Sequence, residues 1–185
     1  MIFFSIFIKI LLILCLGENM KKKLFLLLMP IMFLVGCELG NTPTAKVENL
    51  FMKYQKLDSD IDMGIDDILT DQSMTDNQKE RYRTLLKNQY RNLTYEIIEE
   101  LIDGDNASVM VEIEVIDYKR AINDLVFDSN VQTKEQYDDE KLSRLENAKD
   151  KVTYTLEIEL TKNDDGMWKI DALSNEDVKK IQGMY

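Results

Sequence analysis

The chain of 185 residues contains no histidine, two cysteines, two prolines and one tryptophan. Without histidine it cannot build a Ser-His-Asp or Cys-His catalytic group, a histidine-ligated metal centre or a histidine pH switch. Cys15 and Cys37 both lie in the N-terminal fifth of the chain, so the rest has no thiol for a disulfide, a zinc site or a redox pair. These absences exclude several enzyme classes.

Basic residues are also scarce, because 34 acidic residues face 23 basic ones and the net charge is −11. Residues 1–36 contain four lysines and one glutamate, so residues 37–185 are more acidic than the chain as a whole. Such a surface argues against nucleic acid and against charge-driven binding of anionic lipid headgroups. A solubilising surface accounts for the charge, and a specific cationic partner is the alternative.

Residues 20–37 have the pattern of a secretion signal. Lys21-Lys22-Lys23 precedes a 13-residue run from Leu24 to Gly36, and the run ends in Leu34-Val35-Gly36-Cys37. A helix of that length reaches roughly 20 Å, which is less than the ~30 Å core of a bilayer. The ending resembles a bacterial lipobox, in which Cys37 becomes the mature N-terminus and carries lipid on its sulfur. We therefore interpret residues 20–36 as a lipoprotein signal peptide; an unmodified Cys37 behind an ordinary signal is the alternative.

Residues 1–19 contain a second apolar run, Met1–Leu16, which duplicates the signal. Leu16-Gly17-Glu18-Asn19 back-translates to a purine-rich stretch of the kind found at ribosome-binding sites. We expect Met20 to be the true start and residues 1–19 to be untranslated; an additional N-terminal leader is the alternative.

Residues 37–41 form a short tether after the lipidation site. About four extended residues span on the order of 14 Å, so the following domain must lie close to the bilayer. Residues 42–185 have the length of one domain. The expected location is the cell membrane, with the domain held by lipid at its extracytoplasmic face.

Apolar periodicity predicts the elements of this domain. Helices are expected from Thr42-Pro43 to Leu57, over Asp60–Leu69 and over about 76–91, where Thr75 and Gln78 form a capping box. A strand from Leu93 contains a bulge near Ile97-Ile98 and turns back at Asp103–Asn106 into a strand with Val109, Val111, Ile113 and Val115 inward. Tyr118–Lys149 is expected to be helical, first along Ala121, Ile122, Leu125 and Val126 and then after the Thr133–Gln136 cap. Strands at Val152–Leu160 and Trp168–Ala172 and a helix capped by Ser174 complete the domain.

The glutamates on the strands predict repulsion between like charges. Glu112 and Glu114 alternate outward on one strand, and Glu157 and Glu159 do so on another. If those strands pair, like charges meet across them. We expect partial cover by basic side chains of the helical crossover, Lys134, Lys141 or Arg144.

The fold class is α+β: a curved antiparallel four-stranded sheet packed on N-terminal helices, with a helical crossover between strands 2 and 3 and a short C-terminal helix. This layout resembles the cystatin-like, nuclear transport factor 2-like superfamily, in which a curved sheet wraps a long N-terminal helix. It resembles more closely the small uncharacterised lipoproteins of low-GC Gram-positive bacteria. The matching segments are Cys37 with its lipobox, Thr42–Val47, Ile102–Asp105 and Gly166–Asp171. The resemblance carries over no catalytic residue, because enzymes of this superfamily typically place Asp and His in the cone.

Two groups of side chains are candidates for chemistry. Asp58, Asp60 and Asp62 resemble the start of a calcium-binding loop, but Met63 and Leu69 replace the glycine and glutamate that such a loop needs, so a solvated helix start is the better interpretation. Glu99, Asp117 and Tyr118 lie near predicted strand ends, where the mouth of a cone would be, and a buried carboxylate there could act as a general base. Hydrogen-bonded or exposed acids are the simpler reading, and Trp168 is expected in the core.

We therefore expect a lipid-anchored binding or interaction module without catalysis, cofactor or metal, whose ligand is a protein or a small molecule. The alternative is a small enzyme that uses a carboxylate and a tyrosine inside a cone. The open face of the sheet also offers an interface for a homodimer, which is common in the superfamily named above.

Overall fold

The computed structural model describes residues 40–70 and 73–185; the predicted leader, signal peptide and lipobox lie outside these residues. Gly40–Tyr185 form one compact unit. Its elements, in chain order, are α3 (Pro43–Lys56), α4 (Ser59–Thr70), α5 (Asp76–Asn92), β1 (Thr94–Asp103), β2 (Asn106–Ile116), α6 (Tyr118–Ala121), α7 (Lys134–Asn147), β3 (Lys151–Lys162), β4 (Trp168–Ile170) and α8 (Asn175–Ile181).

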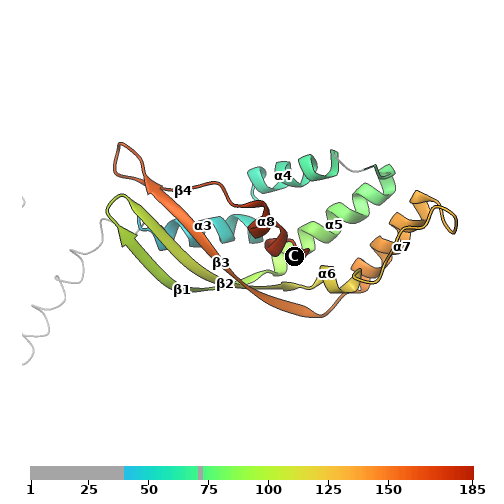
Figure 1. Ribbon diagram of the computed structural model, residues 1–185. Helices are drawn as coiled ribbons and strands as arrows, with labels where there is room; N and C mark the ends of the chain where they lie inside the picture. Colours follow the sequence, from blue (N-terminus) through green and yellow to red (C-terminus); the bar gives the residue numbers. More distant parts are fainter. Residues whose placement is uncertain (1–39, 71–72) are drawn as a thin grey trace, which may run out of the picture. The chain divides into compact units, whose positions relative to one another are not determined.

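The sheet is open and antiparallel, with strand order β1-β2-β3-β4. The connection that contains α6 and α7 joins β2 to β3, which pair directly along their whole length. Helix α3 packs against β1, β2 and β4, and α7 lies at the opposite end of the long strands (Figure 1). The predicted α+β fold, with its helical crossover and short closing helix, is confirmed.

Local side-chain bonds start the helices where the sequence predicts. The Thr42 hydroxyl accepts a hydrogen bond from the backbone N–H of Ala45 at 3.1 Å, and Pro43 occupies the first turn of α3. Both α5 and α7 begin with a complete capping box, Thr75–Gln78 in α5 and Thr133–Gln136 in α7. These caps satisfy backbone donors that have no partner inside a helix.

The β1–β2 hairpin contains the predicted bulge and turn. Ile97 pairs with Val111 and Glu99 with Met110, so Ile98 is an extra residue in β1. The two-residue turn uses Gly104 at φ +62°, a conformation that costs glycine little. Because of the extra residue, the inward side of β1 changes from odd-numbered to even-numbered positions beyond Ile98.

The core lies between the inner face of the sheet and the helices. Phe51 of α3 stacks on Tyr95 of β1, with ring centroids 4.9 Å apart. Trp168 is buried as expected, and the ammonium of Lys162 lies 4.7 Å from its ring centre. The fully buried strand residues are the ones whose alternation predicts an inward position: Val109, Val111, Ile113, Val115, Leu156, Ile158 and Leu160. Each large aliphatic or aromatic side chain buried in this way contributes about 1.5–3 kcal/mol to the free energy that favours the folded state.

A side-chain amide closes the end of β2. Gln89 is buried in α5; its Nε2 donates to the carbonyl of Ile116 at 3.0 Å, and its Oε1 accepts from the Ile116 N–H at 3.1 Å. Gly183, at φ +69°, lies so close that a Cβ there would overlap the Ile116 carbonyl oxygen. The Gly183 carbonyl in turn accepts from the N–H of Lys119 at 2.8 Å. The C-terminal segment is thus bonded to α6 and packs closely against the end of β2.

The prediction of a helical crossover over Tyr118–Lys149 is wrong for residues 122–133. Helix α6 ends at Ala121 after one turn, and Val126 is 76% exposed. The Asp128 carboxylate accepts from the N–H of Asn130 at 2.8 Å, a local bond that competes with helix formation. The apolar residues 121, 122, 125 and 126 therefore do not form one helical stripe.

The expected clash of glutamates between β2 and β3 is also wrong, because the register places Glu112 opposite Thr155 and Glu157 opposite Met110. The like-charge pair across strands is Glu96 of β1 with Glu112. Lys151 bonds Glu114 at 2.6 Å.

The crossover bases do not cover these acids as predicted. Arg144 pairs with Asp124 and Glu140, and Lys134 bonds Asp138, which is almost fully buried in α7. The third of these bases, Lys141, is half-buried in α7. Burial lowers the pKa of its ammonium group, and the nearby Asp138 partly offsets this effect.

Candidate functional site

The outer face of the sheet is acidic and open to solvent. We call it the acidic face. Its outward side chains are set by the strand register: the carboxylates Glu96, Glu99, Asp103, Glu112, Glu114, Glu157 and Glu159, and the lysines Lys151 and Lys169. Carboxylates thus outnumber ammonium groups on this face, which gives this surface a negative potential.

A hollow of roughly 390 Å³ lies at the end of the acidic face, next to the β1–β2 turn. Leu101 and Asp103 line it from β1, and Glu159 and Thr161 from β3. The Thr161 hydroxyl donates to the carboxylate of Asp171, also in the wall, at 3.1 Å. The hollow is open to solvent and combines apolar and acidic walls, so it fits a side chain of a partner better than an enclosed small molecule.

The first described residues are fixed to the same end of the sheet. The Asn41 Nδ2 donates to the carbonyl of Gly166 at 3.1 Å, and its Oδ1 accepts from the Trp168 N–H at 2.9 Å. Asn41 thereby clamps the turn between β3 and β4. We call this pair of bonds the Asn41 clamp. It fixes the point at which the tether enters the domain.

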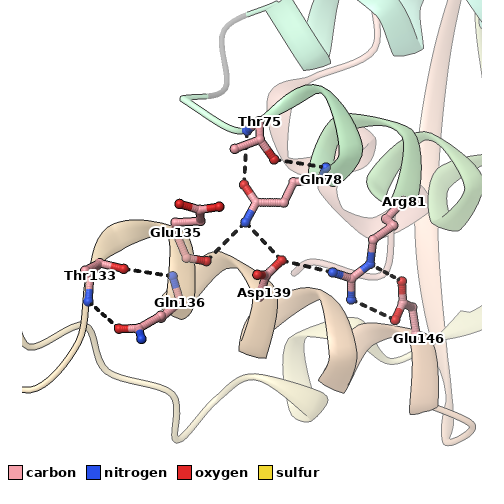
Figure 2. Close-up of polar contacts among 8 residues, drawn as sticks. All are labelled: Thr75, Gln78, Arg81, Thr133, Glu135, Gln136, Asp139 and Glu146. Carbon is pink, nitrogen blue, oxygen red and sulfur yellow. Dashed lines mark hydrogen bonds and ion pairs between the residues drawn. The ribbon is translucent and has the colours of Figure 1, made fainter.

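The interface between α5 and α7 contains a polar network (Figure 2). The buried Gln78, already part of the α5 capping box, donates from Nε2 to the Glu135 carbonyl at 3.1 Å and to the Asp139 carboxylate at 3.0 Å. Arg81 bonds Asp139 at 3.0 Å and forms a bidentate pair with Glu146 at 2.8 and 2.9 Å. These bonds lower the pKa of Glu146 below its usual value, with hydrogen bonding from Arg81 as the main cause. The side-chain bonds of the network join α5 to α7, so we assign it to stability.

Glu99, Asp117 and Tyr118, proposed from the sequence to line a pocket, do not surround one cavity in the described residues. Glu99 is exposed on the acidic face opposite Met110, whereas Asp117 follows the last residue of β2. Met110 and Asp117 are seven positions apart along an extended chain, on the order of 23 Å. Asp117 caps α6 by accepting from the Arg120 N–H at 2.9 Å, and the Tyr118 hydroxyl donates to the Leu85 carbonyl at 3.5 Å.

Tyr118 belongs instead to a group of buried tyrosines that includes Tyr54, Tyr82 and Tyr90. The rings of Tyr54 and Tyr90 meet edge to face, with centroids 5.0 Å apart. Burial raises the pKa of all four phenols, and it raises the pKa of Tyr118 to about 12. A phenol that resists ionisation in this way is a structural group and a poor general base at neutral pH.

The acids that resemble a calcium loop pair with lysines. Asp60 lies 3.5 Å from the Lys53 ammonium, and Asp62 lies 2.6 Å from that of Lys87. Within residues 40–70 and 73–185, no three His, Cys, Asp or Glu side chains are grouped so that they could hold a metal ion. Asp60 and Asp62 lie in the first turn of α4, where the helix dipole favours negative charge.

Comparison of the chain with family models, curated proteins and solved structures finds no match. In the part of the chain that the structure describes, no helix has both the length and the apolar character needed to cross a bilayer.

Sequence reasoning missed Asn41 and Glu100 as residues with defined roles. Nothing around Asn41 signals a contact with a turn about 125 positions away. For Glu100 a signal exists: the predicted bulge at Ile97-Ile98 reverses the facing of the residues behind it, which moves Glu100 from the outer to the inner side.

Proposed function

We propose that this protein is a lipid-anchored binding module on the extracytoplasmic face of the cell membrane, with lipid on Cys37. The observation that carries the proposal is the lipobox pattern Leu34-Val35-Gly36-Cys37, and the Asn41 clamp begins the folded domain four residues after that cysteine. Since four residues span at most on the order of 14 Å, a lipid on Cys37 keeps the β3–β4 turn near the headgroups.

The chemistry of the described surface supports binding as the task of the domain. The carboxylates of the acidic face are exposed except for the half-buried Glu114, while the buried tyrosines are enclosed by the core. A surface of this kind attracts a cationic partner and steers its approach, which is a binding function that needs no cofactor.

Metabolic labelling with a clickable fatty acid tests the anchor. We expect the wild-type chain to take up label and to partition into the membrane fraction, and the Cys37→Ser variant to do neither. Leu39→Ser is the matched control, because it changes a neighbouring residue and leaves Leu34-Val35-Gly36-Cys37 intact. Equal labelling of wild type and Cys37→Ser would overturn the proposed anchor.

The side of the membrane is tested separately with an Asp67→Cys variant in the Cys15→Ser background. Asp67 is an exposed residue of α4, so a thiol there is open to reagents. A membrane-impermeant maleimide should label it in intact cells as fully as in lysed cells. Labelling only after lysis would place the domain in the cytoplasm and contradict the proposal.

A further inference from the structure

In residues 40–70 and 73–185, strand β1 has a pairing partner on one side only and so borders the sheet. It is the first strand in the order β1-β2-β3-β4 and has β2 as its partner on one side. Among the described residues, no backbone group of Thr94–Asp103 bonds outside the β1–β2 ladder. A strand of ten residues with such an edge presents a row of unpaired N–H and C=O groups to any extended chain.

The side chains of β1 are unusual for an exposed edge. Ile98, Leu101 and Ile102 are exposed by 51%, 57% and 55%, and the strand contains no lysine, arginine or proline. Its charges are all negative, from Glu96, Glu99, Glu100 and Asp103. Natural proteins protect edge strands with lysine, proline, bulges or a covering element. Here the bulge is present, and the remaining protection is negative charge, which leaves the apolar side chains open to a partner of opposite charge.

A second copy of this chain is a poor occupant. Pairing two β1 strands would bring the carboxylates of both strands together without a single cation from either. Like charges across neighbouring strands destabilise the pair. The same argument applies to stacking two acidic faces, since carboxylates dominate both.

We propose that the free edge of β1 binds an extended segment of a partner protein in which Lys or Arg alternates with apolar residues, added to the sheet as a fifth strand. The segment supplies main-chain hydrogen bonds to the unpaired edge, as in other cases of strand addition. An alternating sequence suits this edge because successive side chains of a strand point to opposite faces of the sheet. The basic residues of the partner would lie on the side of the acidic face, and its apolar residues would lie beside Ile102 on the inner side.

The hollow beside the β1–β2 turn strengthens this choice of partner. Leu101, Ile102 and Asp103 of the edge strand form part of its wall, and Glu159 and Asp171 lie across from them. A lysine or arginine on the added strand, about 5 Å from β1, reaches over the edge into this acidic hollow. Its apolar stem packs on Leu101 while the cation meets the carboxylates.

This inference gives a partner class to the proposed binding function, but it does not require the lipid. The test uses the full chain in a nonionic detergent and three fluorescent ten-residue peptides: alternating Lys and Val, alternating Glu and Val, and the Lys–Val peptide with alternate backbone nitrogens methylated. Fluorescence anisotropy should show binding of the first peptide alone. Methylation keeps the charge and removes the donors on one edge of the peptide, so equal binding of the first and third peptides would overturn strand addition.

Protein variants locate the site. The double variant Glu99→Lys with Asp103→Lys should weaken binding of the Lys–Val peptide at least about tenfold. The matched control, Asp67→Lys with Glu135→Lys, changes the net charge equally on α4 and α7 and should bind within about twofold of wild type. Equal weakening in both double variants would mean that charge alone, without the edge, attracts the peptide.

Two further measurements separate the remaining outcomes. Cys37→Ser should bind the peptide as wild type does, so failure of the anchor and failure of the edge are read independently. Sedimentation equilibrium of the wild-type chain should show a single protomer; a dimer dispersed by Glu99→Lys with Asp103→Lys would mean that a second copy occupies the edge and would overturn the proposal.

Discussion

Glu100 of β1 caps the first turn of α3, although it lies 56 positions after Thr44 in the sequence. Its Oε2 accepts both the backbone N–H and the hydroxyl of Thr44, at 2.8 and 2.6 Å. Thr44 lies in the first turn of α3, where backbone donors lack partners inside the helix and the helix dipole favours a negative charge. The contact exists because the bulge at Ile98 moves Glu100 to the inner side of the sheet.

Replacing Glu100 should therefore loosen the join between α3 and the hairpin. We expect Glu100→Ala to lower the free energy of unfolding by about 1–2 kcal/mol, through loss of the cap and of the charge at the helix end. Urea denaturation measures the change. Glu99→Ala is the control: Glu99 is on the opposite side of the strand, and its loss should change stability by less than about 0.5 kcal/mol. If the two variants were equally destabilised, the cap would have no special role.

Two glycines should respond to alanine with opposite signs. Gly183→Ala forces a Cβ against the Ile116 carbonyl at a positive φ, so we expect a loss of roughly 2–4 kcal/mol. Gly64 lies within α4 with open space at its Cβ position, so Gly64→Ala should stabilise the protein by about 0.5–1 kcal/mol. Thermal unfolding of both variants beside wild type gives the comparison. A gain of stability in Gly183→Ala would show that the C-terminal segment is not held against β2.

Stability should fall at alkaline pH because of the buried tyrosines. In the unfolded chain tyrosine ionises near pH 10, whereas burial raises the pKa of Tyr118 to about 12 and raises those of Tyr54, Tyr82 and Tyr90. The unfolded state therefore releases these protons first, and the folded state binds more protons in this range. The contribution is fully present below about pH 10 and is lost as the pH rises through about 12.

Tyrosinate absorbance and far-UV circular dichroism, recorded together during an alkaline titration, check this expectation. Absorbance should rise in two steps, and the second should coincide with loss of the helical signal. A single step near pH 10 with the circular dichroism unchanged would contradict the burial of these phenols.

The Arg81–Glu146 pair should stabilise the α5–α7 interface in a pH-dependent way. Arg81→Lys keeps the charge but loses the bidentate geometry, so we expect a loss of about 0.5–1 kcal/mol at neutral pH, a small value because the two side chains are 29% and 39% exposed. The bonds from Arg81 lower the pKa of Glu146, so the contribution is present above the unfolded value of about 4.3 and is lost as the pH falls through the lower folded value.

Urea unfolding of wild type and Arg81→Lys across the acidic range should show the difference between them shrinking as Glu146 is protonated. Arg91→Lys, at an exposed arginine of α5, is the control and should show no such trend. A difference that stays constant down to the lowest pH would exclude Glu146 as the partner that matters.

The proposed anchor also predicts an orientation. Labels on single cysteines at Asp165 in the β3–β4 turn and at Asn130 in the α6–α7 connection would lie at opposite ends of the long strands (Figure 1). In vesicles containing quencher lipids, the lipidated chain should show strong quenching at Asp165→Cys and weak quenching at Asn130→Cys. The reverse order would show that the Asn41 clamp does not hold the β3–β4 turn near the membrane.

Most elements of the fold follow from local sequence signals. The caps at Thr42, Thr75, Thr133 and Ser174 and the glycine turn at Gly104 depend on bonds between residues a few positions apart, so the printed sequence is enough to place them. The exception is residues 122–133, where apolar residues spaced as in a helix compete with an Asp128 turn. Propensity alone does not decide such a competition, and Val126 ends in solvent.

The candidate site was much harder to predict than the fold. Glu99, Asp117 and Tyr118 are near strand ends in the sequence, but their distances depend on the strand register and on which face each residue takes. The same register decides that Glu96, and not Glu157, lies opposite Glu112. Side-chain type reveals the charge of the acidic face and leaves open which carboxylates are neighbours.

The sequence by itself determines the absence of histidine chemistry, the strong negative charge, the lipobox pattern at Cys37 and the order of helices and strands, because each depends on composition or on neighbours along the chain. Only the tertiary structure decides that β1 is the first strand of the sheet, that Glu100 caps α3 and that Asn41 clamps the β3–β4 turn. These relationships join residues far apart in the chain, and strand pairing and packing alone bring them within bonding distance.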